Sequence, residues 1–245
     1  MRMWPDGYGR ILLDGVDSTN AEALRRAGDL AGPAWICAHR QSAGRGRRGR
    51  AWAMPEGNFA ASLALRTAEP PERRALRSFV AALALFDAVA EAVGSDRGLA
   101  LKWPNDVLLN GGKMAGILLE GQGEVLVIGL GVNLVAVPDA AALETGAVAA
   151  VSILGETGVR VGAEDFLDRL AAAYAPWETR LVTYGFEPVR QAWLARAARL
   201  GERIVARTAR ETHEGTFETV DASGALVLKT AKGRESIAAA DIFFG

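Results

Sequence analysis

The sequence predicts an α+β fold, in which a large mixed α/β part is followed by a small antiparallel β part. Short apolar runs alternate with helix-like stretches up to about residue 195, as expected where strands and helices share one core. From residue 201 onward, short strand-like runs are separated by polar and glycine-containing turns. The chain has 245 residues, enough for one large and one small domain. We expect the domains to span residues 1–198 and 199–245.

The elements expected before residue 110 follow from capping signals and apolar runs. Residues 18–27 predict a short helix, because Thr19 and Glu22 have the spacing of a capping box and Gly28 can end the helix. A proline pair opens a long helix over residues 70–94. Apolar runs of strand length predict strands at residues 34–38, 59–65, 99–103 and 107–109.

The elements expected after residue 110 begin with a hairpin. Asn110, Gly111 and Gly112 are typical of a hairpin turn. Residues 135–150 are alanine-rich and weakly patterned, so we expect a loop there. Apolar runs predict strands at residues 114–120 and 124–130, amphipathic patterns predict helices at 163–183 and 187–197, and the C-terminal part predicts strands at 203–208, 214–220, 225–229 and 235–238.

The composition is that of a globular protein. Half of the residues are hydrophobic and the formal net charge is only −1, so little excess charge is available for binding polyanions in general. No apolar run reaches the ~18 residues of a membrane helix, and the first residues lack the apolar core of a secretory signal. The single cysteine, Cys37, lies in an apolar run and predicts a buried thiol in a reducing compartment. The two histidines, His39 and His213, lack the spacing of zinc ligands.

The strongest motif places four arginines among three glycines in residues 44–50. Arginine offers planar, bidentate donors to carboxylate and phosphate, and glycine lets backbone approach a ligand closely. The glycines fit a dinucleotide-binding pattern, but Pro55 and Gly57 disfavour the helix that must follow it. The P-loop pattern is absent from the sequence. We interpret the segment as a dedicated phosphate loop, and a solvated basic loop that touches nucleic acid is the alternative.

Four weaker motifs each have a structural alternative. Residues 102–106, Lys-Trp-Pro-Asn-Asp, suit a simple turn but also form a compact polar cluster. Lys113 follows a glycine pair, where it is either an exposed turn residue or a cation at the edge of a pocket. Residues 129–133 end an apolar strand with glycine at alternate positions, which leaves one face bare for a ligand or a crossing chain. Residues 18–20 either cap a helix or present polar groups to a ligand.

Together, and in this order, these motifs resemble the biotin protein ligase family. The matching segments lie at residues 17–20, 41–52, 57–59, 102–106, 113–120 and 129–133. The resemblance implies a class II synthetase-like catalytic domain that binds biotin and ATP, followed by a small SH3-like β-barrel. Because the first motif begins at Asp17, we expect the monofunctional form, without the N-terminal DNA-binding domain that some members carry.

The resemblance also implies an activity and its partners. The enzyme would use ATP and Mg²⁺ to convert biotin to biotinyl-5′-AMP, and would then transfer biotin to a lysine of a biotin carboxyl carrier protein or domain. We expect a cytoplasmic protein that binds no membrane and no specific DNA, and a homodimer is possible. Relatives that transfer lipoate or octanoate share the core fold and form the alternative.

Site roles are carried over by position from the same resemblance. Lys113 and Arg47 would be catalytic, flanking the biotin carboxylate and the α-phosphate. Asp106 would lie beside magnesium, and Lys232 or Arg234 would supply a basic contact from the C-terminal domain. Biotin would contact Ser18, Thr19, Asn20, Gln41, Gly44, Arg45, Lys113, Gly116, Gly129 and Gly131. The nucleotide would contact Arg47, Arg48, Arg50, Trp52, Lys102, Asn105 and Asn133.

Overall fold

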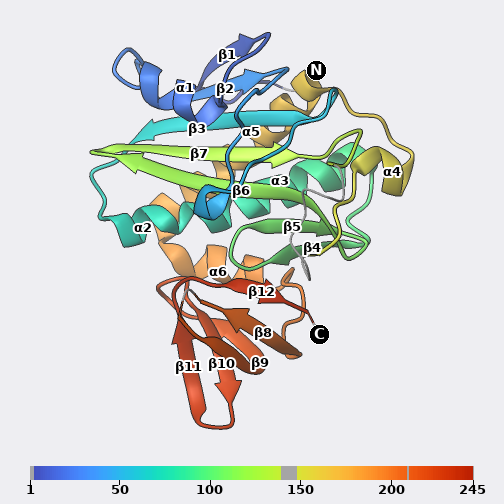
Figure 1. Cartoon of the computed structure of the whole chain (residues 1–245). Coiled ribbons are helices and arrows are strands. Elements are labelled where there is room, and N and C mark those ends of the chain that lie inside the picture. Colours follow the sequence, from blue (N-terminus) through green and yellow to red (C-terminus); the bar gives the residue numbers. More distant parts are fainter. Residues whose placement is uncertain (1–2, 139–147, 209, 245) are drawn as a thin grey trace.

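A computed structural model of the chain describes residues 3–138, 148–208 and 210–244. It contains a seven-stranded sheet with helices on both faces and a five-stranded C-terminal sheet (Figure 1). The larger sheet has the order β1-β2-β3-β7-β6-β5-β4 and is mixed, because β1 and β2 run parallel while its other neighbouring strands are antiparallel. Its strands are β1 (Gly9–Leu13), β2 (Ala34–Ala38), β3 (Phe59–Arg66), β4 (Leu99–Lys102), β5 (Asp106–Leu109), β6 (Gly112–Gln122) and β7 (Val125–Val132). The predicted α+β class is confirmed.

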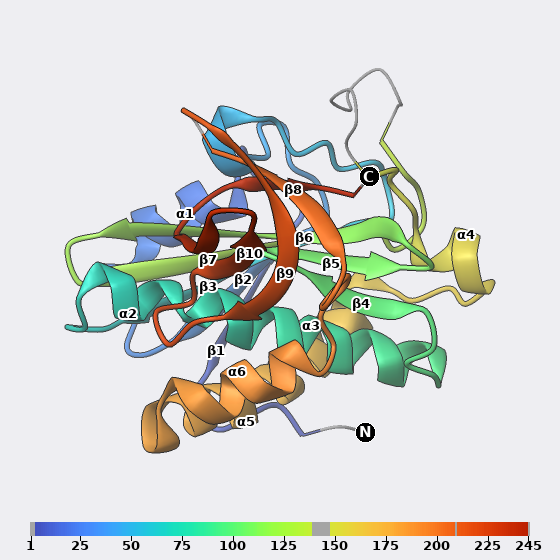
Figure 2. The same ribbon diagram turned by 90° about the horizontal axis from the view of Figure 1, so that it is seen from below.

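The two faces of the larger sheet are covered differently. Helix α1 (Thr19–Arg26) packs through Ala23 on one face, against Ile36 and neighbouring side chains of β3 and β7. Helices α3 (Arg77–Val93) and α5 (Ala163–Tyr184) cover the opposite face, as Figure 2 shows. The short α1 covers only part of its face, so the rest is open for a site.

The remaining elements connect the layers. Helix α6 (Phe186–Leu194) lies between α5 and the C-terminal sheet (Figure 1). The shorter helices are α2 (Pro71–Ala75), the 3₁₀ turn η1 (Arg47–Gly49) and α4 (Ile153–Thr157). At the predicted hairpin, Asn110 and Gly111 have φ angles of 50° and 82°, the left-handed values that a two-residue turn between β5 and β6 requires. In the described part of the chain, no helix is long and apolar enough to cross a membrane.

The C-terminal sheet is antiparallel, with the order β11-β10-β9-β8-β12. It shares a core with the larger part of the molecule, since the rings of Trp193 and Phe217 lie 6.5 Å apart. In addition, Trp103 Nε1 donates a 3.0 Å hydrogen bond to the carbonyl of Gly224. The strands are β8 (Arg203–Arg207), β9 (Thr212–Val220), β10 (Leu226–Thr230), β11 (Gly233–Ile237) and β12 (Asp241–Phe243).

Several expectations about single elements were wrong. The helix expected over residues 70–94 is two helices, because the chain makes a tight turn at Leu76, whose amide donates to the carbonyl of Arg73. Strands β1 and β12 and helix α4 were not expected, since each is short and none has a clear apolar period. Part of the loop expected at 135–150 falls outside the described residues, as does Gly245.

Candidate active site

A cavity of about 550 Å³ opens on the face of the sheet that carries α1. Its walls come from the start of α1, the arginine-rich segment, the centre of the sheet and the strand β12. It is lined by sixteen of the predicted site residues, namely Ser18, Thr19, Asn20, Gln41, Arg45, Arg47, Arg50, Trp52, Lys102, Asn105, Asp106, Lys113, Gly116, Gly129, Gly131 and Asn133. Gly44 and Arg48 are not among the lining residues.

The end of the cavity beside α1 is a neutral hydrogen-bonding network. The backbone amide and the hydroxyl of Thr19 both donate to Gln41 Oε1, at 2.8 Å and 3.1 Å. The buried hydroxyl of Ser62 lies 2.5 Å from Asn20 Oδ1 and 2.8 Å from Thr19 Oγ1. Because Gln41 Oε1 already receives two donors, the amide group of Gln41 is turned away from Thr19. Asn20 Nδ2 also donates to the carboxylate of Glu120 at 2.7 Å, and Glu120 pairs with Arg45, so this end offers donors and acceptors without a net charge.

The predicted capping box at the start of α1 is wrong. The N-cap residue is Ser18 rather than Thr19, and its side chain makes no capping hydrogen bond. Glu22 instead pairs with Arg25 and Arg26, which are within reach on the next turn. Since the Thr19 hydroxyl bonds to Gln41 rather than to the helix amides, its geometry serves the cavity and not the helix end.

The bare strand face predicted at residues 129–133 is filled by the protein's own side chains. A Cβ at Gly129 would overlap the carboxamide of Asn20, and one at Gly131 would overlap the indole of Trp52. Gly116, opposite Gly131 in the sheet, would place a Cβ 3.0 Å from the same indole. These three glycines therefore admit Asn20 and Trp52 to the floor of the cavity.

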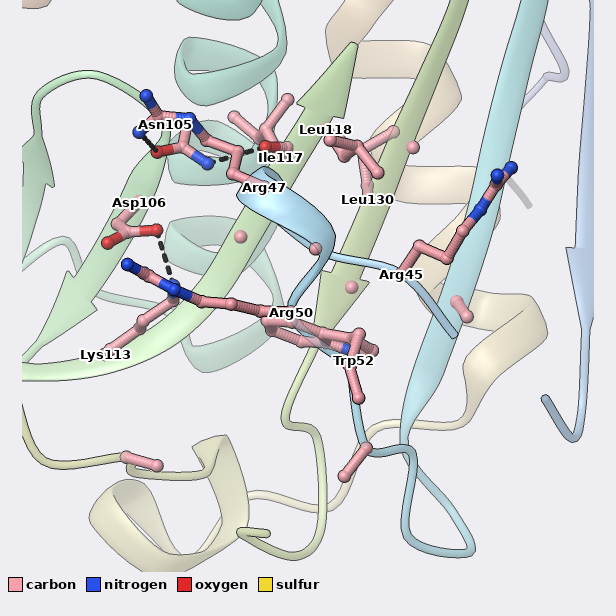
Figure 3. A pocket seen from close by; sticks show the side chains of 18 of the residues that line it. Arg45, Arg47, Arg50, Trp52, Asn105, Asp106, Lys113, Ile117, Leu118 and Leu130 are labelled. Atoms are coloured by element: carbon pink, nitrogen blue, oxygen red, sulfur yellow. Dashed lines mark hydrogen bonds and ion pairs between the residues drawn. The ribbon is translucent and has the colours of Figure 1, made fainter. Parts of the chain in front are cut away.

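The opposite end of the cavity is charged. Asp106 Oδ1 lies 2.7 Å from Lys113 Nζ (Figure 3), and its Oδ2 lies 3.6 Å from Lys102 Nζ. Burial lowers the pKa of the Lys102 ammonium, and the neighbouring Asp106 carboxylate opposes this effect. Asn105 donates to the carbonyl of Ile117 at 2.7 Å and accepts from Arg47 at 3.1 Å. The lining residues of this end thus include four cations and two carboxylates. The cations are Arg47, Arg50, Lys102 and Lys113, and the carboxylates are Asp106 and Asp241.

The arginine-rich segment folds back on itself above this end. The amide of Gly46 donates to the carbonyl of Arg50 at 2.8 Å, and that of Trp52 donates to the carbonyl of Gly44 at 2.9 Å. Gly44 is needed there, because a Cβ would overlap the carbonyl oxygen of Trp52. Arg48, at the turn, has a left-handed φ of 57°. We call residues 44–52 the arginine loop.

The arginines of this loop point in two directions, as Figure 3 shows for three of them. Arg45 reaches towards α1 and pairs with Glu120 at 3.1 Å. Arg47 points towards Asn105, and Arg50 points towards Asp106 and Lys113. Burial lowers the pKa of the Arg47 guanidinium, an effect that Asp241 and Asp106 oppose. The four arginines thus have specific partners within the protein, which favours the phosphate loop over a loop that only touches nucleic acid.

The strand β12 contributes residues that sequence reasoning missed. Asp241, Ile242 and Phe243 line the cavity, and Asp241 pairs with Arg48 and Arg50. The basic contact expected from Lys232 or Arg234 is not made here. Lys232 lies at the β10–β11 turn, and Arg234 of β11 pairs with Glu218 of β9, across the intervening strand β10. Neither residue is among those that line the cavity.

Two further residues singled out in the sequence, Asn133 and Cys37, are buried inside the protein. Asn133 is buried, donates to the carbonyl of Val151 at 3.1 Å and accepts from the amide of Asn58 at 3.5 Å. Cys37 is buried, and burial raises the pKa of its thiol to about 12, so it stays protonated at neutral pH. Asn133 therefore holds the wall of the cavity, and Cys37 is not a nucleophile.

The cavity does not offer a ready-made magnesium site. Both carboxylate oxygens of Asp106 face lysine ammonium groups, which compete with a cation for the same lone pairs. Among the described residues, no three histidine, cysteine, aspartate or glutamate side chains are grouped to hold a metal ion. The residues present thus do not fit a protein-held Mg²⁺, and Asp106 as its neighbour stays a prediction.

Comparisons with known proteins agree with this geometry. The model of the biotin/lipoate A/B protein ligase family matches residues 13–133, and that of the biotin protein ligase C terminal domain matches residues 200–245. A biotin–[acetyl-CoA-carboxylase] ligase of Paracoccus denitrificans is 56% identical over 239 residues, which cover 96% of this chain and 100% of that protein.

More distant relatives extend the comparison. The bifunctional ligase/repressor BirA of Bacillus subtilis is 32% identical over 246 residues, covering 98% of this chain and 75% of that protein. The structure of biotin protein ligase from Aquifex aeolicus in complex with biotin and ATP matches with a TM-score of 0.82 at 24% identity, covering 96% of this chain and 97% of that one. This structural likeness concerns the fold of both parts of the chain.

Proposed function

This chain belongs to the biotin protein ligase family, and from that premise we propose that it activates biotin with ATP and transfers it to a biotin carboxyl carrier protein. The observation that carries the proposal is the polarity of the cavity. One end is a neutral hydrogen-bonding network, the other is cationic, and the apolar side chains of Ile117, Leu118 and Leu130 lie among the lining residues. Biotin has the matching order of groups, a ureido ring, an aliphatic chain and a carboxylate.

The ureido ring fits the neutral end. It carries one carbonyl acceptor and two N–H donors, and the hydroxyl and amide groups of Ser18, Thr19 and Gln41 can serve both kinds of partner. The Ser62 hydroxyl bonds to both Thr19 and Asn20 and so holds the Thr19 hydroxyl in place. A ligand without such polar groups would leave the network unpaired when it excludes water, which costs about 1–3 kcal/mol for each buried group.

This cost weighs against the alternative substrates. The ring of lipoate and the chain of octanoate carry no hydrogen-bonding groups, so neither would offer a partner to the Gln41 amide group that is turned away from Thr19 once water has left the cavity. The family model covers biotin and lipoate ligases together, whereas the Paracoccus denitrificans relative and the C-terminal match name biotin. We therefore place lipoate and octanoate second.

Activation of biotin is a nucleophilic displacement at the α-phosphorus of ATP, and we place it at the cationic end of the cavity. An oxygen of the biotin carboxylate attacks the α-phosphorus of ATP, the bond to the bridging oxygen breaks, and pyrophosphate leaves with its electrons. Two anions must meet for this to happen, and Lys113 and Arg47 lie where they can offset that charge. In the second step, the neutral amine of an acceptor lysine attacks the acyl carbon, and AMP leaves as the amide forms.

Nothing in this sequence of steps requires a nucleophile from the protein. AMP converts a poor acyl donor into a mixed anhydride with a good leaving group, so the work of the chain is to position two substrates and offset charge. Arg50, Trp52 and Lys102 are the lining residues that we assign to the nucleotide, alongside Arg47 and Lys113. Magnesium would arrive with the triphosphate, and we assign it no ligand in this chain.

Incubation with biotin, Mg-ATP and a purified biotin-carrier domain tests the proposal. Intact mass spectrometry should show one biotinyl group added to the carrier, and omission of ATP should abolish the addition. Lipoate in place of biotin should give little product. If the carrier gains lipoyl but not biotinyl groups, the alternative assignment replaces ours. Sedimentation and a DNA titration in the same buffers would test a homodimer and the expected lack of specific DNA binding, which stay predictions.

A further inference from the structure

The arginine loop closes on a carboxylate from the other sheet of the molecule. Asp241 Oδ2 lies 2.5 Å from Arg48 Nη1 and 2.8 Å from Arg50 Nη2. Its Oδ1 lies 3.9 Å from Arg47 Nη1. A single side chain therefore faces three of the four arginines of the loop, and the fourth, Arg45, pairs with Glu120 instead.

Asp241 contacts these arginines with the same geometry that a phosphate group would use. One carboxylate oxygen accepts hydrogen bonds from two guanidinium groups at once, which is a charge-assisted arrangement that arginine forms with both carboxylates and phosphates. Asp241 is also a lining residue of the cavity. Arg50, which the proposed function gives to the nucleotide, is thus already paired with an internal anion, as is its neighbour Arg48.

Asp241 is held in this place by the fold. It opens β12, and its backbone pairs with Arg207 of β8 at the edge of the C-terminal sheet. Its side chain is only 18% exposed, whereas those of Arg48 and Arg50 are 38% and 42% exposed. The carboxylate belongs to a paired strand and the guanidinium groups to a loop, so the arginines are the partners that are free to move.

We propose that Asp241 is a positioning residue that occupies the phosphate-binding donors of the arginine loop and is exchanged for the phosphates of the nucleotide. The proposal rests on the proposed function and adds a regulated step to the same site. Before the nucleotide binds, Asp241 keeps the loop folded over the cavity. When the nucleotide binds, Arg48 and Arg50 leave Asp241 for phosphate oxygens. Nucleotide binding is thereby coupled to the contact between the two sheets.

The exchange has a measurable consequence for anion affinity. In the parent protein, a phosphate must displace a carboxylate and gains only the difference between the two contacts. With Asp241→Asn, the competing charge is gone while the shape of the side chain is kept. Two partly exposed ion pairs of this kind are worth about 1–2 kcal/mol together, so the variant should bind the anion roughly tenfold more tightly.

Calorimetric titration of the full chain with inorganic pyrophosphate, and with ATP in the absence of biotin, tests the proposal. We expect Asp241→Asn to lower both dissociation constants about tenfold and to steepen their dependence on salt, because the carboxylate that competes with the phosphate is then gone. Glu218→Gln is the matched control, since it removes the carboxylate of another arginine pair, that with Arg234, in the same sheet. Thermal unfolding of each variant confirms that it is folded.

The outcomes separate this proposal from the one on which it rests. Tighter pyrophosphate and ATP binding by Asp241→Asn alone supports the exchange. Equal or weaker binding by the variant, beside a parent that binds ATP, overturns the exchange and leaves the proposed function intact. If the parent and the variant both fail to bind ATP and pyrophosphate, the assignment of the cationic end to the nucleotide fails, and the exchange fails with it.

Discussion

Replacing Asp106 with asparagine should destabilise the fold, because it leaves a buried lysine without its partner. The side chains of Lys102 and Asp106 are only 9% and 11% exposed, and their charged atoms lie 3.6 Å apart. Lys113 is 34% exposed and can turn to water when the carboxylate is lost, but Lys102 cannot. Breaking a buried pair from one side costs about 3–5 kcal/mol. For a chain of this size, a loss of about 3 kcal/mol lowers the unfolding midpoint by roughly 6–12 °C.

The pH dependence of this loss identifies its cause. Burial already lowers the pKa of Lys102, and loss of the opposing carboxylate lowers it further. The folded variant then gives up this proton at a lower pH than the unfolded chain, whose lysine keeps the ordinary value of 10.5. Between these two values the unfolded chain binds more protons, so the free energy of unfolding rises with pH by up to about 1.4 kcal/mol per pH unit. The deficit of the variant should therefore shrink as the pH rises from 7 towards 10.5, so pH 7 and pH 10 are the two values to compare.

Urea unfolding at both pH values measures these differences. Asp14→Asn removes an exposed carboxylate and serves as the control for the change in net charge. Lys102→Met in the Asp106→Asn background removes the unpaired ammonium, and it should restore most of the stability while leaving the adenylation rate low. The reasoning fails if Asp106→Asn is as stable as the parent at pH 7, or if the double variant is no more stable than the single one.

Three further predictions follow from the cavity. Lys113→Ala should lower single-turnover release of pyrophosphate by about 10²–10³-fold, and Lys232→Ala, outside the cavity, should not; a rate within twofold of the parent removes Lys113 from the chemistry. Arg47→Ala should increase biotinylation of an added bystander protein, because the adenylate escapes a loop that has lost a phosphate contact; unchanged bystander labelling while adenylate is still made would contradict this. Gly129→Ala should raise the biotin dissociation constant about tenfold by displacing Asn20, with ATP affinity unchanged as the control, and calorimetry measures both.

The parts of the site carried by continuous motifs could be predicted from the sequence. The loop at residues 44–50, the turn at residues 102–106 and Lys113 each combine unusual residue types within a few positions, and all contribute to the cavity. The predicted role of the alternate glycines was incomplete. The sequence indicates that one face of β7 is bare, but only the fold shows that Asn20 and Trp52 occupy it.

The parts that could not be predicted depend on long-range contacts. Asp241 carries no local signal, because it lies in a three-residue strand about 190 residues from the arginines that it meets. Ser62 is a single hydroxyl in an apolar strand, and its role appears only when α1 brings Asn20 over it. The capping box predicted from the spacing of Thr19 and Glu22 is not formed. The Thr19 hydroxyl bonds to Gln41 and the Glu22 carboxylate to Arg26, so neither group is left to cap the helix.

The position of β12 in the chain has a consequence for biosynthesis. Every other element that lines the cavity lies before residue 151, so β12 leaves the ribosome after all of them, behind the whole of α5 and α6. N-terminal parts of a nascent chain fold first, and here they would assemble both the neutral end and the arginine loop while the wall formed by Asp241, Ile242 and Phe243 is still missing. The newly made protein therefore acquires a complete site, and the internal partner of its arginines, only after β12 has left the ribosome.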